Sequence, residues 1–397
     1  MKKNVLLISQ SLYGGGAEKV VANLSLELAK FYNVYIVTYE DNTKEYKYQG
    51  TRLNINIPGG NIGIIEKLKN AYRRIKIIRR IKIDYDIDYA ISFVPQTDYA
   101  NVFSDVKGTN CIIEVSSNSS MAFTGVLGKW FRKIVLSLAD TIVSVSYGSS
   151  LDLINNFGIN RKKIKVIYNS CDIEQIKKKK EMKSLDYLKL GRKYIVTAGS
   201  FRYPKGHWHL IKAFACISDE IKDYDLVILG DGEYREQYEE LINNLNLDRS
   251  RIIMPGFLDN PYPVIKNASL FIFTSVFEGF GNVLIEAMAC GVPVFSVDCD
   301  FGPKEIISPN INYKNSLKGF QKGEYGWLFE KWNKEDIDVT NHISAKEKEF
   351  GKCIVQCLLD KESLEFYRIA GYNRCMDFCN EKFGKNLMEL FGDHGKV

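Results

Sequence analysis

Short apolar runs alternate with helical patterns along the first half of the chain. From Ala17 to Lys30, apolar residues recur at the three- and four-residue spacing of one helix face. Apolar runs of strand length lie on either side of this segment and further along. The predicted strands are Val5–Ser9, Val34–Tyr39, Tyr89–Val94, Cys111–Val115, Thr141–Ser146 and Lys165–Ile167. Strands separated by helical segments are typical of βαβ units, so we predict a doubly wound α/β domain with a parallel sheet.

The same alternation restarts after a charged interruption. Gln175–Arg192 contains the run Lys177–Lys180 and few regularly spaced apolar residues, which favours a solvated linker. The strands predicted after it are Tyr194–Ala198, Leu226–Leu229, Arg251–Met254, Leu270–Phe273 and Pro293–Val297, and the helices are Gly206–Cys216, Tyr234–Asn244 and Val283–Ala289. We therefore predict a first domain over residues 1–178 and a second over 190–380. A C-terminal helix at about 381–397 would pack back on the first domain.

Two open parallel sheets direct attention to the carboxyl ends of their strands, where doubly wound folds bind ligands. We expect two Rossmann-like α/β domains that face each other across a cleft. The chemistry is then expected in the loops that line this cleft.

The composition fits two folded domains and argues against several other classes. The chain has 397 residues, 45% of them hydrophobic, which is enough for two cores of ordinary size. No run approaches the roughly 18 apolar residues that span a bilayer, and Val5–Ile8 is too short for a signal peptide core. Nine cysteines, an odd number, favour a reducing cytosol. Cys353/Cys357 and Cys375/Cys379 have helical spacing, so we expect buried helical thiols rather than metal ligands.

Positive charge is concentrated in the first half. Up to Lys180 there are 27 Lys and Arg against 16 Asp and Glu, and beyond it 27 against 32. Within Glu66–Lys82, apolar residues recur at helical spacing with Lys and Arg between them, which predicts a basic amphipathic helix. This helix is either a solvated surface element or, over residues 67–82, a docking face for an anionic membrane or a phosphorylated substrate. No recognition module supports nucleic acid binding.

Two glycine-rich turns predict anion sites. In Phe273–Pro293 a strand ends, Gly279 and Gly281 permit close backbone approach, and a helix begins near Asn282. The free N–H groups and positive dipole end of this helix suit a phosphate or diphosphate. The turn Tyr13–Lys19 similarly offers backbone N–H groups before the first helix.

Charged side chains accompany the second-domain loops. Glu286 lies one turn into the helix, where its carboxylate can accept hydrogen bonds from ligand hydroxyls. Glu278 lies in the loop, nearer to whatever the phosphate carries. The loop Ala198–His207 adds Arg202 and Lys205, two cations that could neutralise a leaving diphosphate. The alternative for this loop is a surface turn shaped by its proline and glycine.

Together these motifs resemble the GT-B glycosyltransferases, in particular the retaining family 4, also called group 1. The matching segments are Gly15–Glu18, Lys205-Gly206, Leu229–Gly232, Pro255–Phe257 and Glu278–Pro293, the last with the family's E-x7-E pattern. The resemblance covers nearly the whole chain. It implies that the second domain binds a nucleotide-sugar donor, that the first binds the acceptor, and that no cofactor or obligatory metal is needed.

The resemblance also implies roles for single residues. Lys205 would hold the diphosphate with Arg202, Glu278 would contact the donor sugar, and Glu286 would hold the ribose. Phe257 or its neighbours would line the base. Backbone contacts to the ligand are expected from Gly15, Gly16, Gly279, Phe280, Gly281, Asn282 and Val283.

Three segments depart from the family pattern or refine it. Ser200 stands where many members have Arg, so the arginine role is shifted to Arg202. Ile113–Asn118 lacks the His that many members carry near the reacting sugar. Asp298–Ile307 is similar to the Gly-Pro-Arg/Lys-Glu-Ile stretch of members that build bacterial surface polysaccharides.

Other chemistry-bearing residues favour structural roles. His207 and His209 flank Trp208 at a helix start, which favours packing or capping. The carboxylates of Asp84–Asp88 and Asp298–Asp300 are expected to be solvated or to cap strand ends rather than to bind a metal.

We therefore expect a retaining, metal-independent glycosyltransferase that acts in the cytoplasm, peripherally on the inner face of the membrane. It would transfer a hexose or N-acetylhexosamine from a UDP-sugar to a sugar hydroxyl of a lipid-linked bacterial surface glycan, such as a capsule or lipopolysaccharide. A UDP-sugar epimerase or dehydrogenase on the same layers, and a non-catalytic nucleotide-sugar-binding partner subunit, remain as alternatives.

Overall fold

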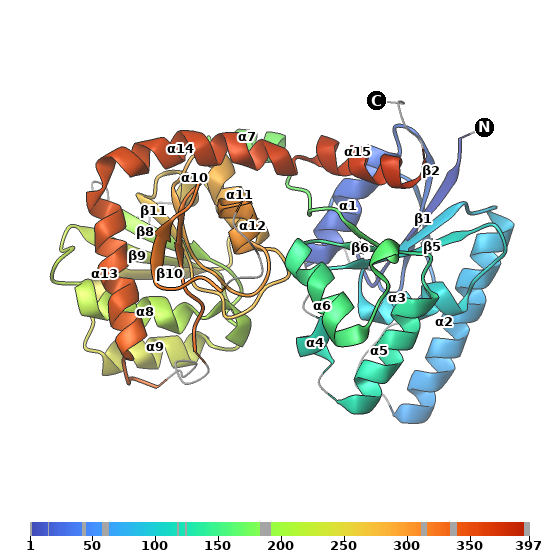
Figure 1. Ribbon diagram of the computed structural model, residues 1–397, viewed down its shortest axis with the longest axis horizontal. Coiled ribbons are helices and arrows are strands. Elements are labelled where there is room, and N and C mark those ends of the chain that lie inside the picture. Colours follow the sequence, from blue (N-terminus) through green and yellow to red (C-terminus); the bar gives the residue numbers. More distant parts are fainter. Residues whose placement is uncertain are drawn as a thin grey trace. The chain divides into compact units, whose positions relative to one another are not determined.

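The chain folds into two compact units, each an α/β layered structure (Figure 1). The computed structural model describes residues 2–14, 16–41, 45–57, 63–116, 119–123, 125–182, 192–310, 316–333 and 340–392. The first unit comprises Met1–Ser170 with Asn380–Val397, and the second comprises Cys171–Cys379. The division between Ser170 and Cys171 thus lies earlier in the chain than the predicted boundary at 178–190.

The first unit is built on a seven-stranded sheet with the order β3-β2-β1-β4-β5-β6-β7. All its strand pairs are parallel. The strands are β1 (Asn4–Ser9), β2 (Asn33–Thr38), β3 (Thr51–Asn54), β4 (Tyr89–Ser92), β5 (Asn110–Val115), β6 (Thr141–Ser144) and β7 (Ile164–Val166). The central strands are buried on both faces, as parallel sheets covered by helices require.

Helices cover both faces of this sheet because each parallel crossover needs a helix to bring the chain back. They are α1 (Gly16–Leu28), α2 (Ile64–Asp84), α3 (Pro95–Phe103), α4 (Ser119–Ala122), α5 (Val126–Leu138), α6 (Tyr147–Phe157) and α15 (Asn380–Leu390). The C-terminal helix α15 contacts α1. Phe391 just beyond it stacks on Tyr89 with ring centroids 4.1 Å apart, and the Tyr89 hydroxyl donates to the Phe391 carbonyl at 2.7 Å.

The second unit repeats the architecture on a sheet with the order β10-β9-β8-β11-β12-β14-β13. Only β13 is antiparallel to its neighbour among the described strands. The strands are β8 (Lys193–Ala198), β9 (Tyr224–Leu229), β10 (Ile252–Gly256), β11 (Leu270–Phe273), β12 (Val294–Val297), β13 (Phe320–Lys322) and β14 (Trp327–Phe329). The predicted fold class, two doubly wound α/β domains, is confirmed.

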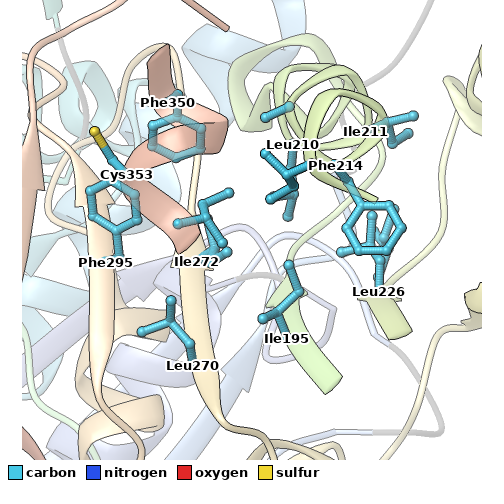
Figure 2. Packing of buried hydrophobic residues seen from close by; sticks show 14 of the residues in the cluster. Ile195, Leu210, Ile211, Phe214, Leu226, Leu270, Ile272, Phe295, Phe350 and Cys353 are labelled. Atoms are coloured by element: carbon cyan, nitrogen blue, oxygen red, sulfur yellow. The ribbon is translucent and has the colours of Figure 1, made fainter. Parts of the chain in front are cut away.

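Helices also pack on the sheet of the second unit, and some of them form a large core with it. They are α7 (Ile173–Lys179), α8 (His207–Ile217), α9 (Arg235–Asn244), α10 (Tyr262–Lys266), α11 (Asn282–Ala289), α12 (Pro303–Ile307), α13 (Ala345–Leu359) and α14 (Lys361–Cys375). Figure 2 shows side chains from the strands meeting those of two helices. The labelled residues are Ile195, Leu226, Leu270, Ile272 and Phe295 from strands, Leu210, Ile211 and Phe214 from α8, and Phe350 and Cys353 from α13.

Two sequence predictions about the chain between and after the sheets were wrong. The lysine-rich segment is not a solvated linker over its first part, because α7 packs on α10 and α11. Lys180 donates to the Ala289 carbonyl at 3.1 Å and lies over the Tyr372 ring. Residues 183–191 of the same segment lie outside the described part. Cys379 does not share a helix with Cys375, since α14 ends at Cys375.

A buried charged network joins α8 to α13. The Glu347 carboxylate lies 2.7 Å from His209 Nδ1 and 3.5 Å from Lys212 Nζ, and all three side chains are almost fully buried. Glu347 also closes a capping box with Ser344 at the start of α13. The expected structural role of His209 agrees with this position, which is further packed by the ring of Trp332 at 3.8 Å.

Among the described residues, no helix is both long enough and apolar enough to cross a bilayer.

Replacing Glu347 tests the buried network. Glu347→Ala removes the carboxylate that faces His209 and Lys212, so it should lower the free energy of unfolding by about 3–5 kcal/mol. Urea unfolding followed by tryptophan fluorescence measures this. The control is Glu349→Ala, on an exposed position of the same helix, which should change stability by less than about 0.5 kcal/mol. Equal effects of the two variants would show that the network contributes nothing.

Candidate functional site

Three loops of the second unit meet at one edge of its sheet. They follow β8, β11 and β12, which are adjacent and parallel in the strand order. The carboxyl ends of adjacent parallel strands lie at the same edge, so the loops 199–206, 274–281 and 298–302 are neighbours. This edge is where doubly wound sheets place ligands, and it holds the predicted residues Lys205 and Glu278.

An ion pair links the first two loops. Lys205 Nζ lies 2.5 Å from Glu278 Oε1, although the two residues are 73 positions apart. The Ser275 hydroxyl donates to the same carboxylate oxygen at 2.8 Å. The Lys205 side chain is 27% exposed and that of Glu278 is 12% exposed. The pair is therefore partly shielded from water, where charge interactions are stronger than at an open surface, yet a ligand can still reach the ammonium group.

Backbone bonds hold the same two loops in register. Val276 N donates to the Pro204 carbonyl at 2.8 Å, and the Thr274 hydroxyl donates to the Lys205 carbonyl at 3.2 Å. Gly206 has a φ of +58°, and a Cβ built there would lie 2.5 Å from the Thr274 carbonyl oxygen. Only glycine therefore fits between the loops at this point, which explains the Lys-Gly pair in the sequence.

The helix α11 begins beside this ion pair. Gly281, with a φ of +97°, precedes it, and no side chain caps its first turn. The N–H groups of a first turn have no intrahelical acceptors, and the dipole makes this end positive. The Asn282 Oδ1 atom is buried and has no hydrogen-bond partner among the described residues. The start of α11 therefore offers backbone N–H donors and the Asn282 side-chain amide. It follows closely in the chain on Glu278, which is paired with Lys205.

The third loop supports the start of α11 from behind. Gly302 has a φ of +96°, and a Cβ there would lie 1.8 Å from the Phe280 carbonyl oxygen. Asp298 and Lys304 form an ion pair at 2.8 Å across the loop, with both side chains largely buried. Gly302 thus packs directly against the Phe280–Gly281 peptide, which leads into α11. The sequence of this segment resembles a family motif, but its contact with Phe280 is seen only in the structure.

Glu286 lies on the next turn of α11. The Tyr262 hydroxyl of α10 lies 3.4 Å from Glu286 Oε1, and the Glu286 side chain is half-buried. The tyrosine hydroxyl is a donor in reach of this carboxylate. Tyr262 was missed by sequence reasoning because it belongs to a helix of only five residues.

The remaining predicted site residues lie in varied surroundings. Gly279, Phe280 and Gly281 are buried, and Val283 is half-buried beside them. Arg202 is exposed at the start of the short 3-10 turn that ends at Lys205.

Two further predicted positions are set apart from this group. Phe257 follows β10, which β9 and β8 separate from β11 in the sheet, and its side chain is 76% exposed. Gly16 begins α1 of the first unit, where it is exposed, and Gly15 lies outside the described residues.

His207 lies directly beneath the Lys205 loop. Its ring packs edge-on against Phe201, and a Cβ at Gly199 would lie 3.4 Å from His207 Nε2. Burial lowers the pKa of His207 to about 4, with a smaller lowering from Lys205. The ring is therefore neutral at pH 7 and packs as an apolar group, as predicted from its place beside Trp208.

The first unit has buried acidic groups of its own at the end of β5. Burial raises the pKa of Glu114 well above its usual value, and the nearby Asp98 carboxylate raises it further. Asp98 is paired with Arg132 at 2.5 Å, both fully or almost fully buried. Glu114 lies in the stretch where the family's His is absent, and its Oε2 atom has no hydrogen-bond partner among the described residues.

Comparison with known families gives two matches that together span most of the chain. The model described as Glycosyltransferase Family 4 matches residues 14–175, and the model described as Glycosyl transferases group 1 matches residues 178–337. The chain is 31% identical over 308 residues to the N-acetylgalactosamine-N,N'-diacetylbacillosaminyl-diphospho-undecaprenol 4-alpha-N-acetylgalactosaminyltransferase of Campylobacter jejuni. That match covers 75% of this chain and 81% of the relative. An uncharacterized glycosyltransferase of Methanocaldococcus jannaschii is 28% identical over 333 residues, covering 80% and 81%.

Solved structures share the fold. The structure of Anabaena HepE in complex with UDP and glucose superimposes with a TM-score of 0.74 at 16% identity, covering 98% of this chain and 99% of that one. Sucrose-phosphate synthase from Thermosynechococcus elongatus has a TM-score of 0.76 at 16% identity, with 98% of each chain covered. At this level of identity the likeness concerns the architecture of the two domains.

The buried imidazole predicts acid sensitivity of the second unit. Because the folded-state pKa of His207 is about 4, below the ordinary value near 6.5, the unfolded chain takes up a proton first as the pH falls through this window. Stability is then fully present above about pH 6.5 and declines by about 3 kcal/mol on acidification to pH 4.

Urea unfolding at several pH values measures this loss. His207→Gln should remove that part of the decline, whereas His342→Gln, at an exposed position, should leave it unchanged. An identical pH profile for wild type and His207→Gln would contradict the assignment.

Proposed function

The chain belongs to the glycosyl transferases of group 1, family 4, with the GT-B fold, and on that basis we propose that it is a retaining transferase that uses a UDP-sugar donor. It would transfer a hexose or N-acetylhexosamine to a sugar hydroxyl of a lipid-linked bacterial surface glycan. The observation that carries this proposal is the Lys205–Glu278 ion pair beside the start of α11.

The donor's diphosphate is proposed to bind at the start of α11. The free N–H groups of the first helical turn and the Lys205 ammonium supply positive potential at one point of the second unit. Glu278 Oε1 already accepts bonds from Lys205 and Ser275, so the carboxylate orients the lysine. Its second oxygen is assigned to a hydroxyl of the donor sugar. Glu286, held by Tyr262, is assigned to the ribose hydroxyls, and the exposed Phe257 ring to the base.

The transfer step needs no covalent enzyme intermediate. The bond between the donor's anomeric carbon and the diphosphate oxygen breaks, and the acceptor hydroxyl oxygen forms the new bond on the same face of the sugar. The acceptor's proton passes to the departing diphosphate oxygen. Negative charge grows on the diphosphate in the transition state, and Lys205 together with the N–H groups of α11 stabilises it there. Arg202, exposed on the same loop, adds a second cation.

The acceptor assignment draws on the relatives. The name of the Campylobacter jejuni relative specifies an acceptor carried on diphospho-undecaprenol. Relatives from Escherichia coli and Bacillus subtilis are named as lipopolysaccharide and poly(glycerol-phosphate) glycosyltransferases. They support an acceptor anchored to a lipid, and hence a place of action at the inner face of the membrane.

One alternative has specific support. Ser200 stands where many family members carry Arg, and no His stands between Ile113 and Asn118. The absence of these Arg and His side chains is expected of a chain that binds the nucleotide-sugar but does not catalyse its transfer. It would bind UDP but neither transfer nor hydrolyse the sugar.

A thermal-shift screen of UDP-, GDP- and ADP-sugars tests the donor class, since a bound ligand raises the melting temperature. UDP-sugars should give the largest shift, and hydrolysis or transfer of the stabilising sugar distinguishes an enzyme from a silent binder. A shift with GDP- or ADP-sugars alone would overturn the donor assignment.

Two substitutions test the charged residues. Lys205→Ala removes a cation that meets the leaving diphosphate, so transfer should fall by about 10²–10³. Glu286→Ala should nearly abolish transfer as well, through lost donor positioning. Initial rates with the sugar found in the screen measure both effects. Lys222→Ala, at an exposed position in the same unit, is the control. Wild-type turnover by either site variant would contradict its assignment.

A substitution of Gly302 tests whether the start of α11 binds the diphosphate. Gly302→Ala must displace the Phe280–Gly281 peptide because its Cβ would meet the Phe280 carbonyl at 1.8 Å. UDP affinity measured by calorimetry should then fall by at least about tenfold, the effect of losing about 1.4 kcal/mol of phosphate contacts.

The matched control for this variant is Gly291→Ala, at the opposite end of the same helix. Gly291 has a φ of +78° but open space around its Cβ position. The control also places a Cβ at a residue with positive φ, at a cost of about 1–2 kcal/mol of stability, and should keep wild-type UDP affinity. Equal UDP affinities of the two variants would exclude the supporting role of Gly302.

A further inference from the structure

Two cysteines that lie far apart in the sequence pair with each other where the second unit begins and ends. The chain passes between the units twice, after Ser170 and after Cys379, so Cys171 and Cys379 are the first and last residues of the second unit. They form an isolated parallel β-bridge. The Cys171 N–H donates to the Phe378 carbonyl at 2.8 Å. This pairing of Cys171 with Cys379 is here named the boundary bridge.

The boundary bridge gives the two thiols the geometry that a disulfide needs. Neighbouring strands lie about 4.7–4.9 Å apart, and residues paired in a parallel bridge direct their side chains to the same face. A disulfide joins residues whose Cα atoms are about 4.4–6.8 Å apart and whose Cβ atoms do not point away from each other. Cys171 and Cys379 meet both conditions through their pairing. Their sulfur atoms can therefore meet by side-chain rotation, without a rearrangement of the backbone.

Buried neighbours hold both cysteines in place. The Phe378 ring, 2% exposed, packs edge-on against Phe280 with ring centroids 5.5 Å apart. The Arg374 guanidinium lies over the other part of this contact, 4.7 Å from the Phe378 centroid. Cys171 is followed by Ile173, which is buried at the start of α7. The two thiols thus have a high effective concentration toward each other, which favours an intramolecular disulfide over mixed disulfides.

The exposure of the thiols gives a small oxidant a way to this pair. All nine cysteines lie in the described part of the chain, and seven of them are buried, whereas Cys216 and Cys379 are half-buried. Cys379 can therefore react first, and the buried Cys171 beside it can attack next. Cys216 lies on α8 and takes no part in the boundary bridge.

Cys375 is the competing partner for Cys379, because it lies four residues before it. Cys375 ends α14, and the 3-10 turn Met376–Phe378 separates it from Cys379. Its Sγ donates to the Tyr372 carbonyl at 3.0 Å, and its side chain is fully buried. The Cys375 thiol is therefore engaged within its own helix, whereas Cys171 is paired with Cys379 through the backbone.

We propose that Cys171 and Cys379 form a reversible disulfide that closes the second unit into a covalent loop under oxidising conditions. The Cys379 thiolate attacks a small-molecule disulfide such as oxidised glutathione, which forms a mixed disulfide and releases one glutathione thiolate. The Cys171 thiolate then attacks the Cys379 sulfur and displaces the second glutathione thiolate. The two cysteines are oxidised, the reagent is reduced to two thiols, and the two cysteine protons pass to them. In a reducing cytosol both cysteines remain thiols.

The disulfide should stabilise the second unit, since it ties the two ends of that unit together. A crosslink restricts the unfolded chain, and the effect grows with the length of the closed loop. Protein treated with oxidised glutathione should therefore melt about 5 °C or more above protein kept in dithiothreitol. Cys171→Ser and Cys379→Ser should each remove this difference between the oxidised and reduced samples. The matched control is Cys216→Ser, at the other half-buried cysteine, and it should keep the difference.

Peptide mapping without reductant identifies the bond directly. After treatment with oxidised glutathione and proteolytic digestion, mass spectrometry should find Cys171 and Cys379 in one pair of linked peptides, which dithiothreitol separates. Cys375→Ser should retain this link, because Cys375 takes no part in it. The mapping uses the full chain, so it does not require that the second unit fold alone.

Three results would overturn the proposal. One is a link between Cys375 and Cys379, and another is glutathione retained on Cys379 with no link to Cys171 after complete reaction. The third is an equal melting temperature of oxidised and reduced wild type. The inference goes beyond the proposed function and does not depend on it. UDP binding is measured on the reduced protein, so failure of the disulfide and failure of the donor assignment are distinguishable.

Discussion

The Lys205–Glu278 ion pair is the contact on which the candidate site depends. It joins two loops that arise from adjacent strands, β8 and β11, and it lies where α11 begins. A partly buried charge needs a partner, and without a ligand each of these residues supplies the other's. An arriving diphosphate would become a second partner for the lysine, so the pair keeps the ammonium in position before the ligand is present. This is preorganisation, in which the cost of orienting the charge is met during folding.

Close backbone approach is the second constraint on the same site. Gly206 lies against the Thr274 carbonyl and Gly302 against the Phe280 carbonyl, both with positive φ. These contacts set how closely the neighbouring loops approach each other. They therefore also set the direction of the first N–H groups of α11. The charged residues and the glycines are two parts of one arrangement: the glycines fix the backbone, and the backbone fixes the direction of the helix dipole.

Much of this was accessible from the pattern of residues, and the rest was hidden for physical reasons. The strand β11 and the start of α11 were predicted because an apolar run, two glycines and an apolar helix face follow in order. The strand β3 was missed because its residues are half-buried or exposed at the sheet's edge and lack an apolar run. Helix α7 was taken for a linker because its apolar positions are few, and the contacts of Lys177 and Lys180 with the Tyr372 ring join residues far apart in the sequence. The support of Phe280 by Gly302 joins residues of different loops, which no local pattern reveals.

Donor binding by the second unit is proposed to depend on Lys205 and the start of α11, and the most direct test is a calorimetric comparison of UDP with uridine. Both carry the base and ribose, so their difference isolates the diphosphate. UDP should bind at least tenfold more tightly than uridine, and this difference should largely disappear in Lys205→Ala. Equal binding of UDP and uridine by the wild type, or no binding of UDP at all, would contradict it.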